Sequence, residues 1–204
     1  MLTKLTTIRN TLSIIIGFFI IMGMNNSINA QEGLNLEEEE KEYDLGISAG
    51  LWLSGDISLN DYNIDIEKSA SLLLRAIGDM YVAPKFAVGG YINISRGDVS
   101  YASEEETFTM FEFGMSFKPR FEISHKQAIK PGLNIGYRKL DIPDYDDAES
   151  DGLGVNLSVE WQFFLESGYI FYIDGGFLSQ PSGGNDDTDV TWSPILYLLG
   201  GVAF

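Results

Sequence analysis

The sequence predicts an all-β fold, an eight-stranded antiparallel up-and-down transmembrane β-barrel. From residue 43 onward, apolar side chains recur at every second position, which is the period of a strand with one apolar face. Each such stretch is about 9 to 11 residues long, the length of a strand that crosses a bilayer. The connections alternate between long and short, as they do when antiparallel strands close into a barrel.

The predicted strands follow one another along the chain at residues 43–53, 71–81, 86–95, 107–117, 129–138, 153–163, 169–178 and 191–204. The sixth shows the pattern most plainly, because apolar residues from Leu153 to Phe163 alternate with small or polar ones. The seventh is apolar on both faces, and Asp174 is placed inward. The long connections are predicted to be loops at residues 54–69, 97–106, 139–152 and 179–190.

The last strand supplies one apolar face and ends the chain on an aromatic residue. That face consists of Trp192, Leu196, Leu198, Val202 and Phe204. This ending resembles the closing strand of bacterial outer-membrane barrels, where a terminal Phe serves as the assembly signal. The resemblance implies that the barrel assembly machinery is a partner, through the strand that ends at Phe204.

Two soluble folds also give alternating strands, a lipocalin-like barrel and a secreted β-sandwich. A water-facing side should be rich in Lys, Glu and Thr, whereas the polar faces here are mostly Gly, Ser and Asn. Such small residues suit the crowded interior of a narrow barrel. Aromatic residues near strand ends are predicted to form one interfacial girdle: Tyr43, Tyr81, Phe86, Phe117, Phe163, Tyr169 and Phe204.

The segment Ile77–Gly89 (IGDMYVAPKFAVG) carries a family resemblance. It is similar to the hairpin of small outer-membrane barrel proteins of the porin family, with an OmpA-like eight-stranded barrel. In that family a strand ending Gly-Tyr-Phe turns and re-enters with an apolar-Ala-apolar-Gly run. This chain departs from the pattern, because Asp79 and Met80 separate Gly78 from Tyr81. The resemblance implies fold and location, and the family includes both adhesins and structural barrels.

The N-terminal part predicts export and membrane insertion. Residues 1–30 have the features of a cleaved signal peptide, with a basic start and an apolar run of about 13 residues, too short to span a bilayer. Residues 31–42 form an acidic tail, predicted to be periplasmic, and residues 43–204 form the barrel domain. We expect an integral protein of the outer membrane in a Gram-negative envelope, with outer-membrane lipid as a partner.

Charge and cysteine content exclude several classes of function. The formal net charge of −17 repels nucleic acid, so no nucleic-acid partner is expected. The chain has no cysteine, which excludes disulfides and thiolate metal sites. His125 is the only histidine and falls in a short turn, where a solvated side chain is expected. No nucleophile elbow, phosphate loop or zinc motif is present, so no enzyme and no cofactor is predicted.

The acidic loops suggest a weak divalent-cation site, because hard cations prefer carboxylate oxygens. The candidate ligands are Asp144, Asp146, Asp147, Glu149 and Asp151. Their spacing matches no EF-hand, and a solvated acidic rim explains the same run of charge.

The lumen is the third candidate site. Charged residues fall at mid-strand on the polar faces: Arg75, Glu112, Arg138, Glu160 and Asp174. A charge enclosed in a narrow barrel is costly unless it is paired, and three of these residues lie on consecutive strands. The sequence therefore predicts an Arg138-centred network with Glu112 and Glu160 that blocks the pore.

The function expected from these features is that of a non-enzymatic outer-membrane barrel. Its lumen would be closed or narrow and polar, and its role would be structural or in surface interaction. An outer-membrane lipid-modifying enzyme, which would need His125, and a small-solute channel are the alternatives. The sequence does not name an extracellular ligand.

Overall fold

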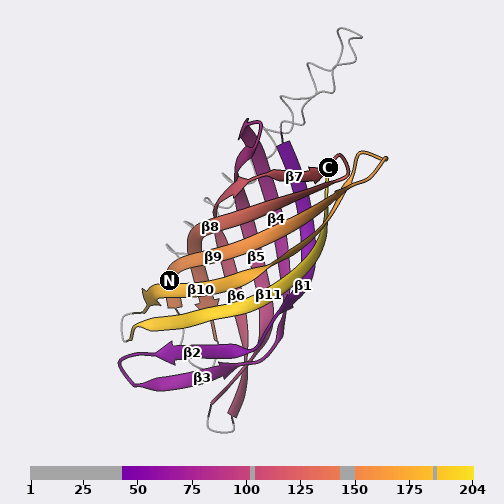
Figure 1. Cartoon of the computed structure of the whole chain (residues 1–204). Coiled ribbons are helices and arrows are strands. Elements are labelled where there is room, and N and C mark those ends of the chain that lie inside the picture. Colours follow the sequence, from indigo (N-terminus) through magenta and orange to yellow (C-terminus); the bar gives the residue numbers. More distant parts are fainter. Residues whose placement is uncertain (1–42, 102–103, 143–149, 186–187) are drawn as a thin grey trace, which may run out of the picture. The chain divides into compact units, whose positions relative to one another are not determined.

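The computed structural model describes residues 43–101, 104–142, 150–185 and 188–204, so the predicted signal peptide and acidic tail lie outside it. Eleven antiparallel strands in these residues belong to one sheet (Figure 1). Their bounds are β1 (Tyr43–Trp52), β2 (Gly55–Leu59), β3 (Ile64–Lys68), β4 (Ser71–Ala83), β5 (Phe86–Tyr101), β6 (Glu104–Pro119), β7 (Phe121–Ser124), β8 (Gln127–Asp141), β9 (Ser150–Phe164), β10 (Ile170–Gly184) and β11 (Val190–Ala203).

Pairing of the first strand with the last closes the sheet into a barrel. Around the wall the order is β1-β4-β5-β6-β8-β9-β10-β11, and β11 returns to β1 with Gly46 opposite Ala203. Leu45 and Phe204 extend this seam by exchanging two backbone hydrogen bonds of 3.0 and 2.9 Å. Closure leaves these strands without a free edge, which confirms the predicted eight-stranded antiparallel barrel.

No helix in the described residues is long and apolar enough to cross a membrane.

The connections differ between the two ends of the barrel. At one end, called the turn end, β1 begins, β11 ends and short turns join β4 to β5 and β9 to β10. At the other, called the loop end, lie the connection between β1 and β4, the ends of β5, β8 and β10, and the starts of β6, β9 and β11. The exposed basic residues Lys85 and Lys126 lie at the turn end beside the acidic Glu122 and Glu166, whereas the described residues of the loop end are mainly acidic.

The prediction that residues 54–69 form a loop is wrong, because they contain the β2–β3 hairpin. β2 pairs with β11 and β3 pairs with β5, so the hairpin continues the barrel wall beyond the ends of β1 and β4. Two bends separate it from the main strands, at residues 53–54 and 69–70. In Figure 1 the hairpin lies across the loop end of the barrel, in indigo to violet.

Other strands also reach further into the predicted loops. β5 and β6 stay paired as far as Tyr101 and Glu104, and β10 continues to Gly184. Short runs of polar residues therefore do not end these strands, because the neighbouring strand still supplies hydrogen-bond partners.

The exterior of the barrel is apolar and the interior is charged. Exposed apolar side chains occur around the wall, among them Ile47, Leu51, Leu74, Ile94, Met115, Ile135, Leu157, Val159, Ile173, Phe177, Leu198 and Val202. Arg138 and Glu112, by contrast, are fully buried. The arrangement is the reverse of a lipocalin, so the soluble-barrel alternative is wrong and the apolar band is a lipid-facing surface.

Two aromatic residues were predicted on the wrong side of the wall. Trp192 is buried inside the barrel, because Ser193 and Pro194 are both exposed and shift the alternation of β11 by one residue. Tyr81 also points inward, and its hydroxyl donates a hydrogen bond of 2.8 Å to Asp44 Oδ2. Tyr43, Phe86, Tyr169 and Phe204 are exposed near the turn end.

Inward-facing glycines make room for long side chains in the lumen. Tyr91, Gly114 and Gly136 are in register on β5, β6 and β8. A Cβ on Gly136 would lie 2.7 Å from the Tyr91 hydroxyl oxygen and 2.8 Å from Gly114 Cα. The tyrosine therefore lies over backbone that carries no side chain.

We predict that Gly136→Ala lowers the stability of the barrel by about 1–3 kcal/mol, because overpacking displaces Tyr91 and the β6 backbone. Gly200→Ala is the matched control, since no atom lies within 4 Å of a Cβ at that lipid-facing position. Unfolding in detergent, followed by the mobility shift between folded and heated protein on a gel, measures both. Equal stability of the two variants would contradict this account of the glycines.

Candidate functional site

The lumen is filled along its length by three layers of side chains. Nearest the turn end lies a group of five charged residues, called here the turn-end cluster: Asp44, Asp79, Lys118, Lys130 and Glu160. Two central ion pairs follow, Arg75–Asp174 and Arg138–Glu112. At the loop end the lumen is closed by buried apolar side chains, called here the apolar plug: Trp52, Ile57, Leu59, Ile66, Leu73, Val99, Phe108, Met110, Leu140, Ile142, Leu178, Val190, Trp192, Ile195, Tyr197 and Leu199.

Asp79 is the centre of the turn-end cluster. Its Oδ2 accepts hydrogen bonds from Lys118 Nζ at 2.9 Å and from Lys130 Nζ at 2.8 Å. Lys130 also donates to Asp44 Oδ2 at 3.1 Å, and Lys118 donates to Glu160 Oε2 at 3.3 Å. Every charge in this group therefore has an opposite charge within hydrogen-bond distance, which offsets the cost of removing it from water.

Neither lysine of the turn-end cluster was predicted to line the lumen. Lys118 was assigned to a turn, but β6 continues to Pro119 and its side chain is almost fully buried. Lys130 shares the inward parity of Asn134 and Arg138 on β8, and strand register places it directly opposite Glu160. Alternation alone could have identified Lys130, because cross-strand neighbours share a face.

The first central pair joins adjacent strands. Glu112 on β6 is the register partner of Arg138 on β8, and Glu112 Oε2 accepts from Arg138 Nε at 3.1 Å and Nη2 at 2.7 Å. Asn156 accepts from Arg138 Nη2 at 2.8 Å and donates to Glu112 Oε1 at 2.7 Å. The remaining donor, Arg138 Nη1, reaches the Ser179 carbonyl at 2.7 Å. Two guanidinium nitrogens therefore converge on one carboxylate oxygen, in charge-assisted hydrogen bonds that are stronger than neutral ones.

The second central pair crosses the lumen. Arg75 on β4 donates to the Asp174 carboxylate on β10, two strands that are not neighbours in the wall. Arg75 Nε also donates to Asn93 Oδ1 at 2.7 Å, and its Nη1 donates to the Tyr197 hydroxyl at 2.9 Å. The pair therefore ties β4 to β10 through the lumen, past the two strands β1 and β11 that separate them in the wall.

The prediction that Glu160 belongs to the Arg138 network is wrong. Glu160 lies in the turn-end cluster with Lys118 and Gln162, whose amide donates to Glu160 Oε1 at 2.7 Å. The register partner of Arg138 on β9 is Gly152, eight residues away from Glu160 along the strand. Consecutive strands bring charges together only where their register also matches.

Aromatic rings organise the apolar plug. Trp52 meets Phe108 and Trp192 edge to face, at ring-centroid distances of 5.9 and 5.2 Å. The Arg138 guanidinium lies 4.9 Å from the centre of the Trp192 ring, so the apolar plug packs directly against the Arg138–Glu112 pair. Side chains from the β2–β3 hairpin complete the layer, which closes the loop end with apolar contacts.

Lys68, at the end of β3, is a charged residue packed against the aromatic rings of the apolar plug. Its Nζ lies 4.1 Å from the centre of the Trp52 ring and donates to three backbone carbonyls, those of Trp52, Leu53 and Ser69. Burial lowers the pKa of this lysine to about 7, because the ammonium form loses its hydration.

The other predicted site residues do not form a site in the described residues. His125 is exposed in the turn between β7 and β8. Of the acidic-loop ligands, Asp144, Asp146, Asp147 and Glu149 lie outside the described residues, and only Asp151 lies within them. No group of three or more side chains suited to a metal ion is found in the described part of the chain.

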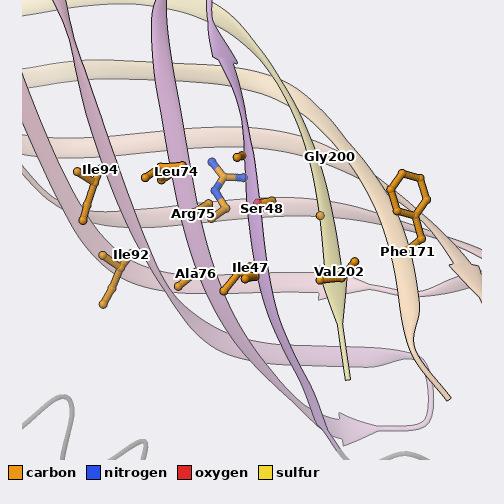
Figure 2. A pocket seen from close by; sticks show the side chains of 12 residues that line it. Ile47, Ser48, Leu74, Arg75, Ala76, Ile92, Ile94, Phe171, Gly200 and Val202 are labelled. Atoms are coloured by element: carbon orange, nitrogen blue, oxygen red, sulfur yellow. The ribbon is translucent and has the colours of Figure 1, made fainter. Parts of the chain in front are cut away.

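A groove of about 710 Å³ lies on the outside of the wall, where β1 meets β4 and β11 (Figure 2). Its floor is formed by the small outward residues Ala49, Ala76 and Gly200, and its walls include Leu74 and Phe171. Most lining residues are apolar and belong to the lipid-facing band, and Ser48 and Arg75 are the polar ones, so the groove is a depression in that band.

A closed antiparallel barrel with an apolar exterior and a lumen of paired charges defines an integral barrel of the outer-membrane class. Several solved structures of outer-membrane barrels share the fold. Neisserial surface protein A (NspA) has 10% identity and a TM-score of 0.56, over 79% of this chain and 94% of that one. OprG of Pseudomonas aeruginosa has 14% identity and a TM-score of 0.55, over 80% and 96%. No family model matches the sequence, and no curated protein matches it.

We predict that Arg138→Ala destabilises the barrel by about 3–5 kcal/mol, because it leaves the fully buried Glu112 carboxylate without its counter-ion. Lys126→Ala is the control. It removes a surface pair with Glu166 whose side chains are 60% and 93% exposed, and such pairs are worth about 0–1 kcal/mol. The double variant Arg138→Met, Glu112→Gln should recover much of the loss in urea unfolding. Equal midpoints for Arg138→Ala and Lys126→Ala would contradict the prediction.

Proposed function

We propose that this chain is a non-enzymatic outer-membrane barrel whose lumen is closed, and that it serves envelope structure and interactions at the cell surface. The observation that carries the proposal is the filled lumen. The turn-end cluster, the two central ion pairs and the apolar plug occupy successive levels of the barrel. With eight strands, an interior of this width is filled by side chains alone.

The energetics of the central pairs support a permanently closed lumen. Opening a path through the centre requires Arg75 to leave Asp174, or Arg138 to leave Glu112, and each separation exposes an unpaired charge inside the barrel. Breaking one such pair costs about 3–5 kcal/mol. Solute passage would need at least one of these events for each opening.

The loop end is the surface offered to the outside. The outward positions of the β2–β3 hairpin carry acidic and polar side chains, among them Asp56, Asp65 and Glu67. NspA, one of the solved structures with this fold, is named a surface protein. Both points support a role in contacts with neighbouring molecules of the envelope or with extracellular partners.

The turn end supports assembly by the machinery that inserts such barrels. Phe204 is 56% exposed, and its backbone pairs with Leu45 at the closing seam. The exposed aromatic side chain beside the closing seam is a surface that a partner protein can contact. We therefore keep the assembly machinery as the proposed partner of this strand.

The enzyme alternative lacks support at His125. The side chain is exposed at the turn end, whereas a catalytic histidine needs a nucleophile and an orienting acid within hydrogen-bond reach. A lipid acyl-transfer or hydrolysis assay on the purified protein and on His125→Ala separates the two functions. Activity that disappears in His125→Ala would establish the enzyme and overturn the proposal.

We predict that the purified barrel shows no large, steady conductance in a planar bilayer, because the three layers leave no continuous aqueous path. The double variant Arg75→Ala, Asp174→Ala removes one central pair and should raise brief conductance events above those of the parent. A stable open channel in the parent protein would establish the channel alternative.

We predict that protease added to intact cells cleaves at the loop end and spares residues 119–127. Short turns of such barrels face the periplasm and long loops face outside. Permeabilised cells provide the control, since the exposed β7 and the turn after it should then be cut. Cleavage between Arg120 and Gln127 in intact cells would reverse the orientation.

A further inference from the structure

Five buried polar atoms inside the barrel have no hydrogen-bond partner among the described residues. They are Ser48 Oγ, Arg75 Nη2, Gln162 Oε1, Tyr172 OH and Asp174 Oδ1. The other atoms of this kind in the described part of the chain lie nearer the two ends of the barrel. Buried polar atoms are almost always hydrogen-bonded, so a group of five in one region of the lumen indicates a further partner.

Strand register places four of these side chains in one row across neighbouring strands. Arg75 on β4 is opposite Ser48 on β1, and Ser48 is opposite Gly201 on β11. Gly201 is opposite Tyr172 on β10, and Tyr172 is opposite Gln162 on β9. Partners across strands share a face, so the whole row faces the lumen.

Two small residues leave space in the middle of the row. Gly201 has no side chain and Ser48 has a short one, so the wall between Arg75 and Tyr172 contributes a single hydroxymethyl group. A Cβ on Gly201 would lie 2.5 Å from Tyr172 Cζ and 2.6 Å from Ser48 Cβ. The tyrosine ring therefore reaches across Gly201 toward Ser48, and the two hydroxyls lie near each other. Figure 2 shows the Arg75 side chain next to Ser48.

The Arg75–Asp174 pair is hydrogen-bonded less completely than the Arg138–Glu112 pair. All three guanidinium nitrogens of Arg138 donate to acceptors, and both carboxylate oxygens of Glu112 accept. In the other pair Arg75 Nη2 and Asp174 Oδ1 have no partner among the described residues, although the two residues are only 5% and 3% exposed. An unpaired atom of a buried charged group is costlier than one of a neutral group, so this pair needs a further ligand.

We propose that this row is a binding site for enclosed water, which bridges Arg75 and Asp174 to the hydroxyls of Ser48 and Tyr172. A buried water needs about two to four polar partners, and these four groups supply both donors and acceptors. An anion would meet the Asp174 carboxylate, and a cation would meet the Arg75 guanidinium. The two opposite charges therefore select a small neutral ligand that both donates and accepts, which is water.

Gln162 extends the site toward the turn-end cluster. Its amide nitrogen donates to Glu160 Oε1 at 2.7 Å and to Asp44 Oδ2 at 3.4 Å, which leaves its Oε1 as an acceptor in the same row as Tyr172. Water that donates to this oxygen joins the central pair to the turn-end cluster by hydrogen bonds. The turn-end cluster and the apolar plug lie on either side, so the bound water stays inside and the lumen remains closed.

A crystal structure of the purified full chain, at a resolution that shows ordered water, is the direct test. The expected result is a water oxygen within about 3.2 Å of Arg75 Nη2 and of at least one of the two hydroxyls, Ser48 Oγ or Tyr172 OH. A structure without ordered water at these atoms would overturn the proposal. In that case Arg75 Nη2 would donate directly to Asp174 Oδ1, and the two hydroxyls would pair with each other.

Solid-state NMR in deuterated lipid tests the site in a bilayer. Magnetisation from water protons should reach the Arg75 guanidinium faster than that of Arg138, which is the internal control because protein groups satisfy all its nitrogens. The double variant Ser48→Ala, Tyr172→Phe removes two of the water's partners and should slow the transfer to Arg75. Equal transfer to the two arginines in the parent protein would contradict the water site.

The sign of one stability change gives a third test. Tyr172→Phe removes only the hydroxyl, and loss of a hydrogen bond to bound water should raise the unfolding equilibrium constant about fivefold. If the buried hydroxyl had no partner, its removal would instead leave the barrel as stable or make it more stable. Tyr169→Phe is the matched control, because that side chain is 54% exposed and its hydroxyl needs no buried partner. A Tyr172→Phe barrel at least as stable as the parent would overturn the proposal.

Discussion

Backbone pairing between β1 and β11 is the interaction on which the rest of the structure depends. In lipid, each unpaired backbone group costs several kcal/mol, so the sheet must have no edge. Closing it places half of all side chains in a narrow enclosed space. The lumen must then satisfy its own polar groups, and the Arg138–Glu112 pair and the Asp79-centred cluster are the result. The glycine positions beneath Tyr91 follow from the same lack of room.

The interior changes character along the barrel axis. Paired charges fill the half nearer the turn end, and apolar rings fill the loop end. In a soluble barrel, charged side chains would lie near the open end, where water solvates them. Here the mouth is covered by the β2–β3 hairpin, so its underside is apolar, and Lys68 is the exception within it. Lys68 lies beside the two bends, where its Nζ donates to the backbone carbonyls of Leu53 and Ser69.

Alternation along the sequence was enough to predict the eight strands of the barrel wall, most of their facing and the inward position of the central charges. It failed where a local irregularity changed the parity, as at Ser193 and Pro194, which turn Trp192 inward. It also could not give register, so Glu160 was assigned to Arg138 although it faces Lys130. Register depends on hydrogen-bond geometry between strands distant in sequence, which no single segment records. The β2–β3 hairpin was missed because its outward face is polar.

The loop end carries an excess of exposed acidic side chains, among them Asp56, Asp61, Asp65, Glu104 and Glu105. All copies inserted by the same route point the same way, so neighbouring barrels present like charge at the same height and repel one another. The repulsion weakens as ionic strength rises, since salt screens exposed charge. Dispersal of single barrels across the membrane is thus favoured at low ionic strength, and close packing of barrels becomes easier at high ionic strength.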